Sequence, residues 1–280
     1  MKKRFFTLLV LSAMFALTVP VQAQLKSLNK AVKKATTSAE ETVKKTADDV
    51  STSAKETAKN TVDAAEEAAR DMAADKVSVK IVEWLDKNNK VLPDDNDYCK
   101  RLTSLVNNKY TSVDGLSLNY KVYENDEANI LACANGSIRI YSGMMDFLTD
   151  EQLLGIVSVQ IGHIKNKDVR EALVKVASED NASNAVSAQL DKILSFSGEK
   201  MGTFVNELIQ VPYSAEQNTA ADAFAYNLLK QNDADVKGLL TALEKFAEVE
   251  AAEDNEESVA LKYITVNSSN AERIKTVAVE

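Results

Sequence analysis

The chain has 280 residues, of which 45% are hydrophobic and 27% are charged, and its formal net charge is −9 at pH 7. Proteins that bind phosphate groups need dense positive charge, so this acidic balance excludes nucleic acid as the expected partner. A chain of this length is long enough to form a domain with a substantial hydrophobic core.

The first residues have the features of a secretory signal peptide. Residues 2–4 are basic, residues 5–19 are apolar, and residues 21–23 place small side chains where a signal peptidase cleaves. The apolar run is shorter than the roughly 20 residues of a membrane-spanning helix, and no later run reaches that length. We therefore expect residues 1–23 to be cleaved near Ala23, which leaves a periplasmic or secreted chain without a transmembrane segment.

Residues 24–74 are predicted to form an Ala/Lys/Glu-rich helical arm or spacer. An 11-residue period runs through residues 31–74 as AVKKATTSAEE, TVKKTADDVST, SAKETAKNTVD and AAEEAARDMAA. This period keeps equivalent positions on one slowly drifting stripe of an α-helix, but small side chains bury little area there. The arm is therefore a solvated helical or partly disordered spacer. The alternative is an amphipathic helix that pairs through residues 30–74 with itself, a partner or an envelope surface.

Residues 75–280 have a globular composition and are expected to form one domain. Residues 94–108 carry apolar side chains at helical spacing. Between residues 116 and 141 the period changes to two, and Asn135-Gly136 separates alternating runs, which is the strongest short signal for a β-hairpin. After Gly143 only helical patterns follow. The predicted fold class is therefore α+β, mostly helical with a small β-hairpin sheet.

The only two cysteines, Cys99 and Cys133, leave two alternatives open. In an oxidising compartment they can form one disulfide. They can equally remain two buried thiols, because the sequence does not show whether their Cα atoms come close.

The segment SVQIGHIK, residues 158–165, belongs to a predicted buried helix. The helix begins with the capping box Thr149-Asp150-Glu151-Gln152, and apolar side chains lie nearly all round it. His163 in this segment is the only histidine of the chain. On its own, a buried histidine is more often a hydrogen-bonded core residue than a metal ligand.

Three segments, in this order and spacing, resemble a known family: NYKVYENDEANILACANGSIRIYSGMMDFLTDEQLLGIVSVQIGH, PYSAEQNTAADAFAYNLL and VNSSNAERI. They are similar to the secreted HtpX-like zinc metallopeptidases, in particular the periplasmic LoiP-type members, over about residues 94–274. The resemblance implies a gluzincin-like metallopeptidase domain. The first segment corresponds to the family's edge strand, hairpin and zinc helix, the second to the helix with the third ligand, and the third to the C-terminal segment.

The resemblance also assigns roles to positions in the predicted buried helix. In the family, two histidines four residues apart bind zinc, and the glutamate after the first activates a water molecule. Here Val159 occupies the first ligand position, Gln160 the general-base position, and His163 the second ligand position. Valine has no atom that binds zinc, and a glutamine side chain has no basic lone pair near neutral pH.

The remaining positions of the resemblance depart from the family in the same way. Asn218 occupies the third ligand position, Asp222 is the acid that follows it, Asn267 replaces a C-terminal histidine, and Arg273 is retained. An amide is a poor zinc ligand compared with a carboxylate. Glu216 is the nearest spare carboxylate, but two residues rotate a helix by about 200°, so it should face away. We therefore expect a vestigial cleft with no catalytic residue, no metal and no cofactor.

Three functional hypotheses follow from these features. The first is an inactive metallopeptidase homologue that binds extended polypeptide by β-augmentation near Leu131–Ser137, or serves as an adaptor in envelope protein quality control. The second is an active zinc metalloendopeptidase of the same family. The third is a scaffold that acts through the N-terminal repeats. A structural alternative for the cleft is that Gln160, His163, Asn218 and Asp222 merely satisfy one another in the core.

Overall fold

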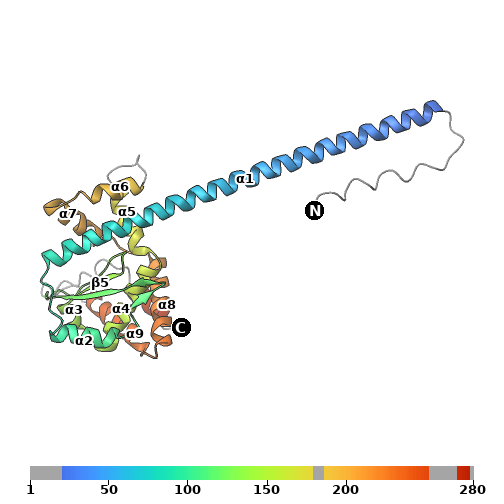
Figure 1. The fold of residues 1–280 in the computed structure, drawn as a ribbon. Helices are drawn as coiled ribbons and strands as arrows, with labels where there is room; N and C mark the ends of the chain where they lie inside the picture. Colours follow the sequence, from blue (N-terminus) through green and yellow to red (C-terminus); the bar gives the residue numbers. More distant parts are fainter. Residues whose placement is uncertain (1–20, 179–185, 252–269, 278–280) are drawn as a thin grey trace. The chain divides into compact units, whose positions relative to one another are not determined.

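The computed structural model describes residues 21–178, 186–251 and 270–277. The first element of the described residues is the long helix α1 (Val21–Asn88). The chain divides into two units, residues 1–64 and 65–280, so the C-terminal part of α1 belongs to the second unit. Figure 1 shows the order of the elements. Among the described residues, no helix combines the length and apolar character needed to cross a membrane.

The elements of residues 89–277 confirm the predicted α+β class. A short helix precedes five short strands, and within the described residues only helices follow the last strand, as the sequence patterns predict. The elements are α2 (Asp97–Val106), β1 (Ser112–Val113), β2 (Leu116–Ser117), β3 (Asn119–Tyr123), β4 (Ile130–Ala132), β5 (Ser137–Tyr141), α3 (Ser142–Phe147), α4 (Asp150–Lys165), α5 (Asp168–Ser178), α6 (Val186–Ile193), α7 (Gly198–Leu208), α8 (Ala215–Gln231), α9 (Lys237–Ala251) and α11 (Asn270–Val277).

The main sheet has three strands in the order β3-β5-β4. β3 runs parallel to β5, and β4 runs antiparallel to β5 with Leu131 opposite Arg139. The predicted hairpin at Asn135-Gly136 is confirmed, and Gly136 adopts a φ of +84°, which favours glycine. The edge strand β4 ends at Ala132, so much of the expected edge region Leu131–Ser137 is turn rather than strand.

Both faces of the central strand β5 are buried. Ile138 and Ile140 belong to the core shared with α4, α8 and α9, whereas Tyr141 belongs to a second core that also contains the C-terminal part of α1. The polar residue between the two isoleucines, Arg139, is only 1% exposed. Alternate side chains of β5 therefore face two different cores.

Asp86 of α1 compensates the charge of Arg139. It accepts hydrogen bonds from Arg139 Nε at 2.8 Å, Lys121 Nζ at 2.8 Å and the Tyr123 hydroxyl at 2.6 Å. Burial alone would raise the pKa of Asp86, but these hydrogen bonds outweigh it and lower the pKa to about 2. The ion pair therefore fixes this part of α1 against the sheet.

Helix α4 lies in the centre of the first core and is placed there by its cap and two glycines. Thr149 and Gln152 form the predicted capping box. A Cβ atom on Gly162 would lie 2.8 Å from the carbonyl oxygen of Ala221 in α8, and one on Gly155 would lie 2.7 Å from the Cα of Leu239 in α9. The glycines therefore permit close contact of α4 with both helices.

The two cysteines are both free thiols in this structure. Cys133 follows β4 and is buried, which raises the pKa of its thiol to about 12. Cys99 is partly buried in α2.

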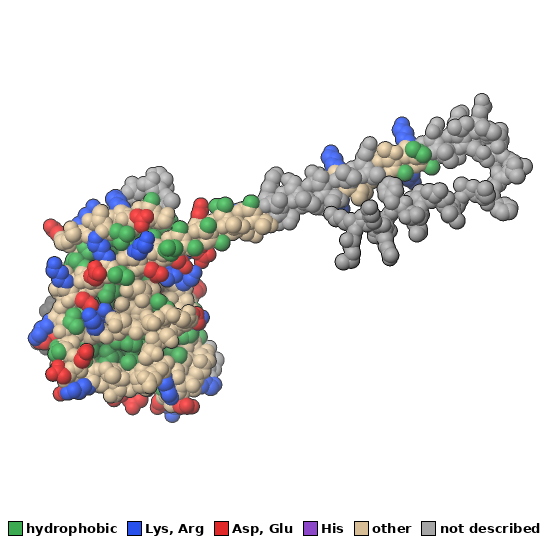
Figure 2. All heavy atoms as spheres, viewed as in Figure 1, with side chains coloured by type: hydrophobic (Ala, Val, Ile, Leu, Met, Phe, Trp, Pro, Cys, Tyr) green, Lys and Arg blue, Asp and Glu red, His purple; other side chains and the backbone are tan. Residues whose placement is uncertain are grey.

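Figure 2 shows acidic and basic side chains interspersed over the visible face of residues 65–280.

Candidate functional site

The fold brings six of the seven predicted cleft residues into its interior. Val159, Gln160 and His163 lie on α4, Asn218 and Asp222 lie on α8, and Arg273 lies on α11. All six side chains are buried. The seventh, Asn267, lies outside the described residues.

His163 is held by two residues that sequence reasoning did not identify. Its Nδ1 lies 2.8 Å from Oδ2 of the buried Asp168, and its ring stacks on Tyr213 with 3.8 Å between ring centroids. Asp168 reaches this position because Lys167 adopts a φ of +65° between α4 and α5. The acid stands five residues after the histidine, a spacing that gives no sequence signal for their contact.

The surroundings of His163 determine its protonation state. Burial is the largest effect and lowers the pKa of the imidazole, although the hydrogen bond with Asp168 opposes this shift. The neutral ring then donates its Nδ1–H to the Asp168 carboxylate. Its Nε2 is buried and has no hydrogen-bond partner among the described residues.

Asp222 does not bond to His163 but forms an ion pair with Arg273. Arg273 Nε donates to Oδ2 at 2.8 Å and Nη2 donates to Oδ1 at 2.7 Å. Asp222 is 0% exposed and Arg273 is 3% exposed. Both carboxylate oxygens are therefore used, and the charge of the acid is compensated inside the protein.

Asn218 contributes to the N-terminal end of α8. Its Nδ2 donates to the backbone oxygens of Ser214 at 3.1 Å and Tyr213 at 3.3 Å. Glu216 is exposed and accepts a hydrogen bond from the Ser214 hydroxyl at 2.8 Å, so it faces away from the buried side of the helix as its position predicts. Within the described residues, no three His, Cys, Asp or Glu side chains are arranged to hold a metal ion.

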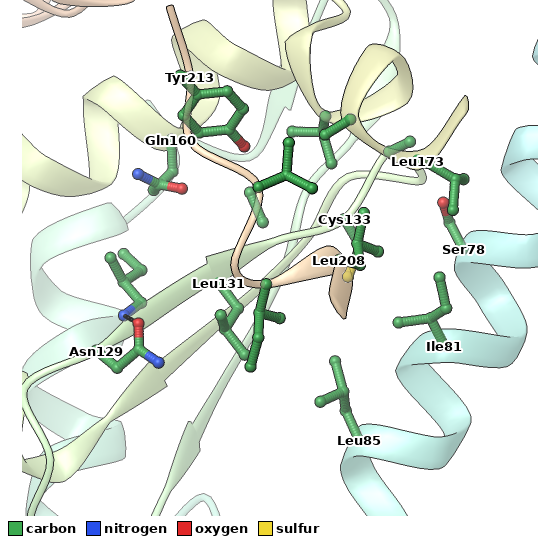
Figure 3. A pocket seen from close by; sticks show the side chains of 17 residues that line it. Ser78, Ile81, Leu85, Asn129, Leu131, Cys133, Gln160, Leu173, Leu208 and Tyr213 are labelled. Atoms are coloured by element: carbon green, nitrogen blue, oxygen red, sulfur yellow. Dashed lines mark hydrogen bonds between the residues drawn. The ribbon is translucent and has the colours of Figure 1, made fainter. Parts of the chain in front are cut away.

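A cavity of about 80 Å³ lies beside these residues (Figure 3). Gln160 and Tyr213 lie at one end of it, and Ile81 and Leu85 of α1 lie at the other. None of its lining residues has a charged side chain. The lining comprises Ser78, Ile81, Leu85, Asn129, Ile130, Leu131, Ala132, Cys133, Ala134, Gln160, Val169, Ala172, Leu173, Leu208, Ile209, Val211 and Tyr213.

One side of the cavity is the outer edge of β4. Asn129 accepts from Tyr141, and Cys133 donates to Ser137, so odd-numbered residues of this segment bond to β5. In an antiparallel pair, the even-numbered residues Ile130 and Ala132 therefore direct their N–H and C=O groups away from β5. The N–H of Ile130 is occupied by the Asn129 side chain at 2.9 Å. The backbone groups of Ala132 point toward the outer edge without a strand partner in the described sheet.

Comparisons with known proteins identify a family for this chain. The model of Peptidase family M48 matches residues 100–277. Metalloprotease LoiP of Escherichia coli K12 is 34% identical over 167 residues, which cover 59% of this chain and 66% of LoiP. Metalloprotease YcaL of the same organism is 31% identical over 173 residues, which cover 59% of this chain and 65% of YcaL.

The matches cover only part of this chain and part of each relative. The chain spans just under two thirds of the length of both relatives. The family match includes the sheet, α4, α8 and α11, but α1 lies before it. Because the match covers more than half of the chain and contains all the described cleft residues, this protein belongs to peptidase family M48.

Proposed function

We propose that this chain is a catalytically inactive member of family M48 that binds extended polypeptide in the periplasm or outside the cell. The observation that carries this proposal is the side-chain chemistry around His163. A metallopeptidase needs several metal ligands and a general base directed at one point. Here the positions that correspond to the other ligands, the base and the following acid carry a valine, two amides and an acid bound to arginine, while the Asp168 carboxylate is bound to His163 itself.

The residues present do not fit a zinc ion. Val159 offers no donor atom, and Asn218 offers only a neutral amide oxygen, which is a poor zinc ligand compared with a carboxylate. Asp222 would have to break two charge-assisted hydrogen bonds with Arg273 before it became a ligand. Only His163 keeps a nitrogen of the type that zinc prefers, and one ligand does not make a site.

The position next to Val159 also lacks the group that activates water. Gln160 is 3% exposed and its amide oxygen is not basic near neutral pH. Its amide has nearly the shape of a glutamate side chain, so the cleft keeps its form while the proton acceptor is missing. We infer loss of hydrolysis with retention of the scaffold.

Binding of polypeptide is supported by the edge of β4. An added strand would pair with the outward groups of Ala132, and the cavity beside this edge would receive an uncharged side chain. Such recognition depends on backbone groups, so it suits unfolded segments of many proteins. Together with the signal-like residues 1–23, this supports an adaptor role in envelope protein quality control.

The test begins with the mature chain, residues 24–280, purified without a metal-affinity tag. We expect less than about 0.1 zinc per chain by elemental mass spectrometry, before and after zinc loading and dialysis, because fewer than three good ligands converge. We also expect binding of an unfolded, fluorescein-labelled casein without its cleavage. Stoichiometric zinc together with chelator-sensitive cleavage would overturn the proposal of inactivity.

Active peptidase chemistry is a second candidate because of one observation. The buried Nε2 of His163 has no hydrogen-bond partner among the described residues, and an imidazole nitrogen of this kind is a common metal ligand. The variant His163→Ala separates the two functions. It should abolish cleavage if the chain is a peptidase, and it should leave casein binding within about twofold if the chain is only a binder.

A further inference from the structure

The cavity beside β4 is completed by a segment outside the family match. Ser78, Ile81 and Leu85 of α1 line it, whereas the match with family M48 begins at residue 100. These three residues follow one another at helical spacing and share one side of α1. The opposite wall, formed by the β4 segment and Gln160, lies within the match.

This part of α1 is a fixed wall rather than a mobile cover. Ile81 is 2% exposed and Leu85 is 4% exposed, and both belong to the core that α1 forms with α5, α6 and α7. Asp86, the next residue, is bound to Arg139 of β5 at 2.8 Å. Moving the helix would expose this core and leave the Arg139 charge without its partner, so the shape of the cavity is set by the folded chain.

The size and polarity of the cavity restrict what can enter it. Its volume of about 80 Å³ is several times the roughly 10–15 Å³ that one water molecule needs. It is about half of a roughly 150 Å³ apolar cavity that admits a benzene ring. A charged group would be desolvated there without an ion-pair partner, because the lining carries no charge.

We propose that the α1 wall makes this cavity a specificity pocket for one branched aliphatic side chain, valine, leucine or isoleucine, of an extended polypeptide paired with β4. This inference rests on the proposed polypeptide binding and adds which side chain of the polypeptide is preferred. Side chains alternate along a strand, so a segment aligned with Ala132 presents every second side chain to one face. Leu85 and Ile81 then decide how large that side chain is.

The experiment measures binding of twelve-residue peptides of serine and threonine, labelled with fluorescein, to the mature chain by fluorescence anisotropy. One central position carries alanine, valine, leucine, phenylalanine or lysine. We expect leucine and valine to bind at least about tenfold more tightly than alanine, phenylalanine or lysine, because they bury more apolar area than alanine, whereas phenylalanine is too large and lysine is charged.

Two variants change the pocket in opposite directions. Leu85→Ala enlarges it and should raise the affinity for the phenylalanine peptide at least about tenfold relative to leucine. Ala172→Leu, at a half-buried lining position on α5, fills it and should remove the preference among aliphatic residues. Val79→Ala changes a 47% exposed side chain on the same helix and should alter nothing.

The outcomes separate this inference from the function on which it rests. If none of the peptides and no casein binds to the wild type, the proposed function fails. If casein binds but the peptide preference is the same in wild type, Leu85→Ala and Ala172→Leu, the function stands and the α1 pocket is wrong. Circular dichroism of each variant shows that it is folded, and Ala172→Leu decides the question if Leu85→Ala does not fold.

Discussion

Arg273 and Asp222 form an ion pair with two hydrogen bonds, 2.8 Å and 2.7 Å long, in which neither side chain is more than 3% exposed. The pair joins α11 to α8, so the C-terminal helix is attached to the helix that carries Asn218. Because each oxygen of the acid accepts a hydrogen bond from Arg273, the pair joins the two helices inside the protein.

Breaking this pair should strongly destabilise the protein. Arg273→Gln leaves the buried Asp222 carboxylate without its counter-ion, and we expect a loss of about 3–5 kcal/mol in the free energy of unfolding. Urea denaturation followed by circular dichroism measures it. Lys275→Gln, at an exposed position of the same helix, is the control. A loss below about 1 kcal/mol for Arg273→Gln would contradict the buried pair.

Asp86 should make the stability depend on pH in the acid range. Its pKa is lowered to about 2 in the folded state, below that of an unfolded aspartate near 3.9. The folded state therefore binds fewer protons, and the stabilisation is complete above about pH 4 and is lost as the pH falls toward 2. We expect Asp86→Asn to lose about 3 kcal/mol at pH 7, because Arg139 loses its partner.

Measurements of stability at acidic pH test whether Asp86 is the acid responsible. Urea midpoints between pH 5 and pH 2.5 should fall less steeply for Asp86→Asn than for the wild type. Glu83→Gln, an exposed acid one turn earlier on α1, should keep the wild-type slope. Parallel slopes for all three proteins would mean that Asp86 is not the acid responsible.

The close contacts of α4 should make two of its glycines intolerant of alanine. Gly155→Ala and Gly162→Ala each place a Cβ within 3 Å of a neighbouring backbone, and we expect losses of about 1–3 kcal/mol. Gly202→Ala in α7 meets only the Trp84 ring at 3.0 Å and gains helix propensity, so its effect should be smaller. Thermal unfolding of the three variants tests whether Gly202→Ala loses less stability than the two substitutions in α4.

Removal of metal should not affect this protein if the cleft is vestigial. A structural zinc contributes directly to folding, so chelation destabilises a protein that depends on it. We expect 5 mM EDTA to leave the melting temperature of the mature chain unchanged within about 1 °C. If EDTA lowers the melting temperature by several degrees and added zinc restores it, the protein binds zinc and the cleft is not vestigial.

Local signals in the sequence were sufficient for part of the fold. The capping box at Thr149 and Gln152 and the hairpin at Asn135-Gly136 depend on residues close together in the chain, and both are confirmed. The burial of Arg139 was not foreseeable in this way. It depends on Asp86, 53 residues earlier, and on a helix packed against the outer face of β5.

The same distinction holds for the candidate site. The positions of His163, Asn218 and Asp222 followed from the family resemblance, and the fold brings their helices together. Their partners did not follow from it. The contact of His163 with Tyr213 joins segments 50 residues apart, and Asp222 with Arg273 joins segments 51 apart, so only the folded chain shows them.

The stacking of the only histidine on Tyr213 has a practical consequence. One imidazole in the chain gives one set of imidazole proton signals in a magnetic resonance spectrum, and a tyrosine ring 3.8 Å away shifts them by its ring current. Tyr213 also lines the cavity, so a molecule that enters and tilts this ring changes the shift. The protein therefore carries its own reporter of occupancy, without any label, at the end of this cavity.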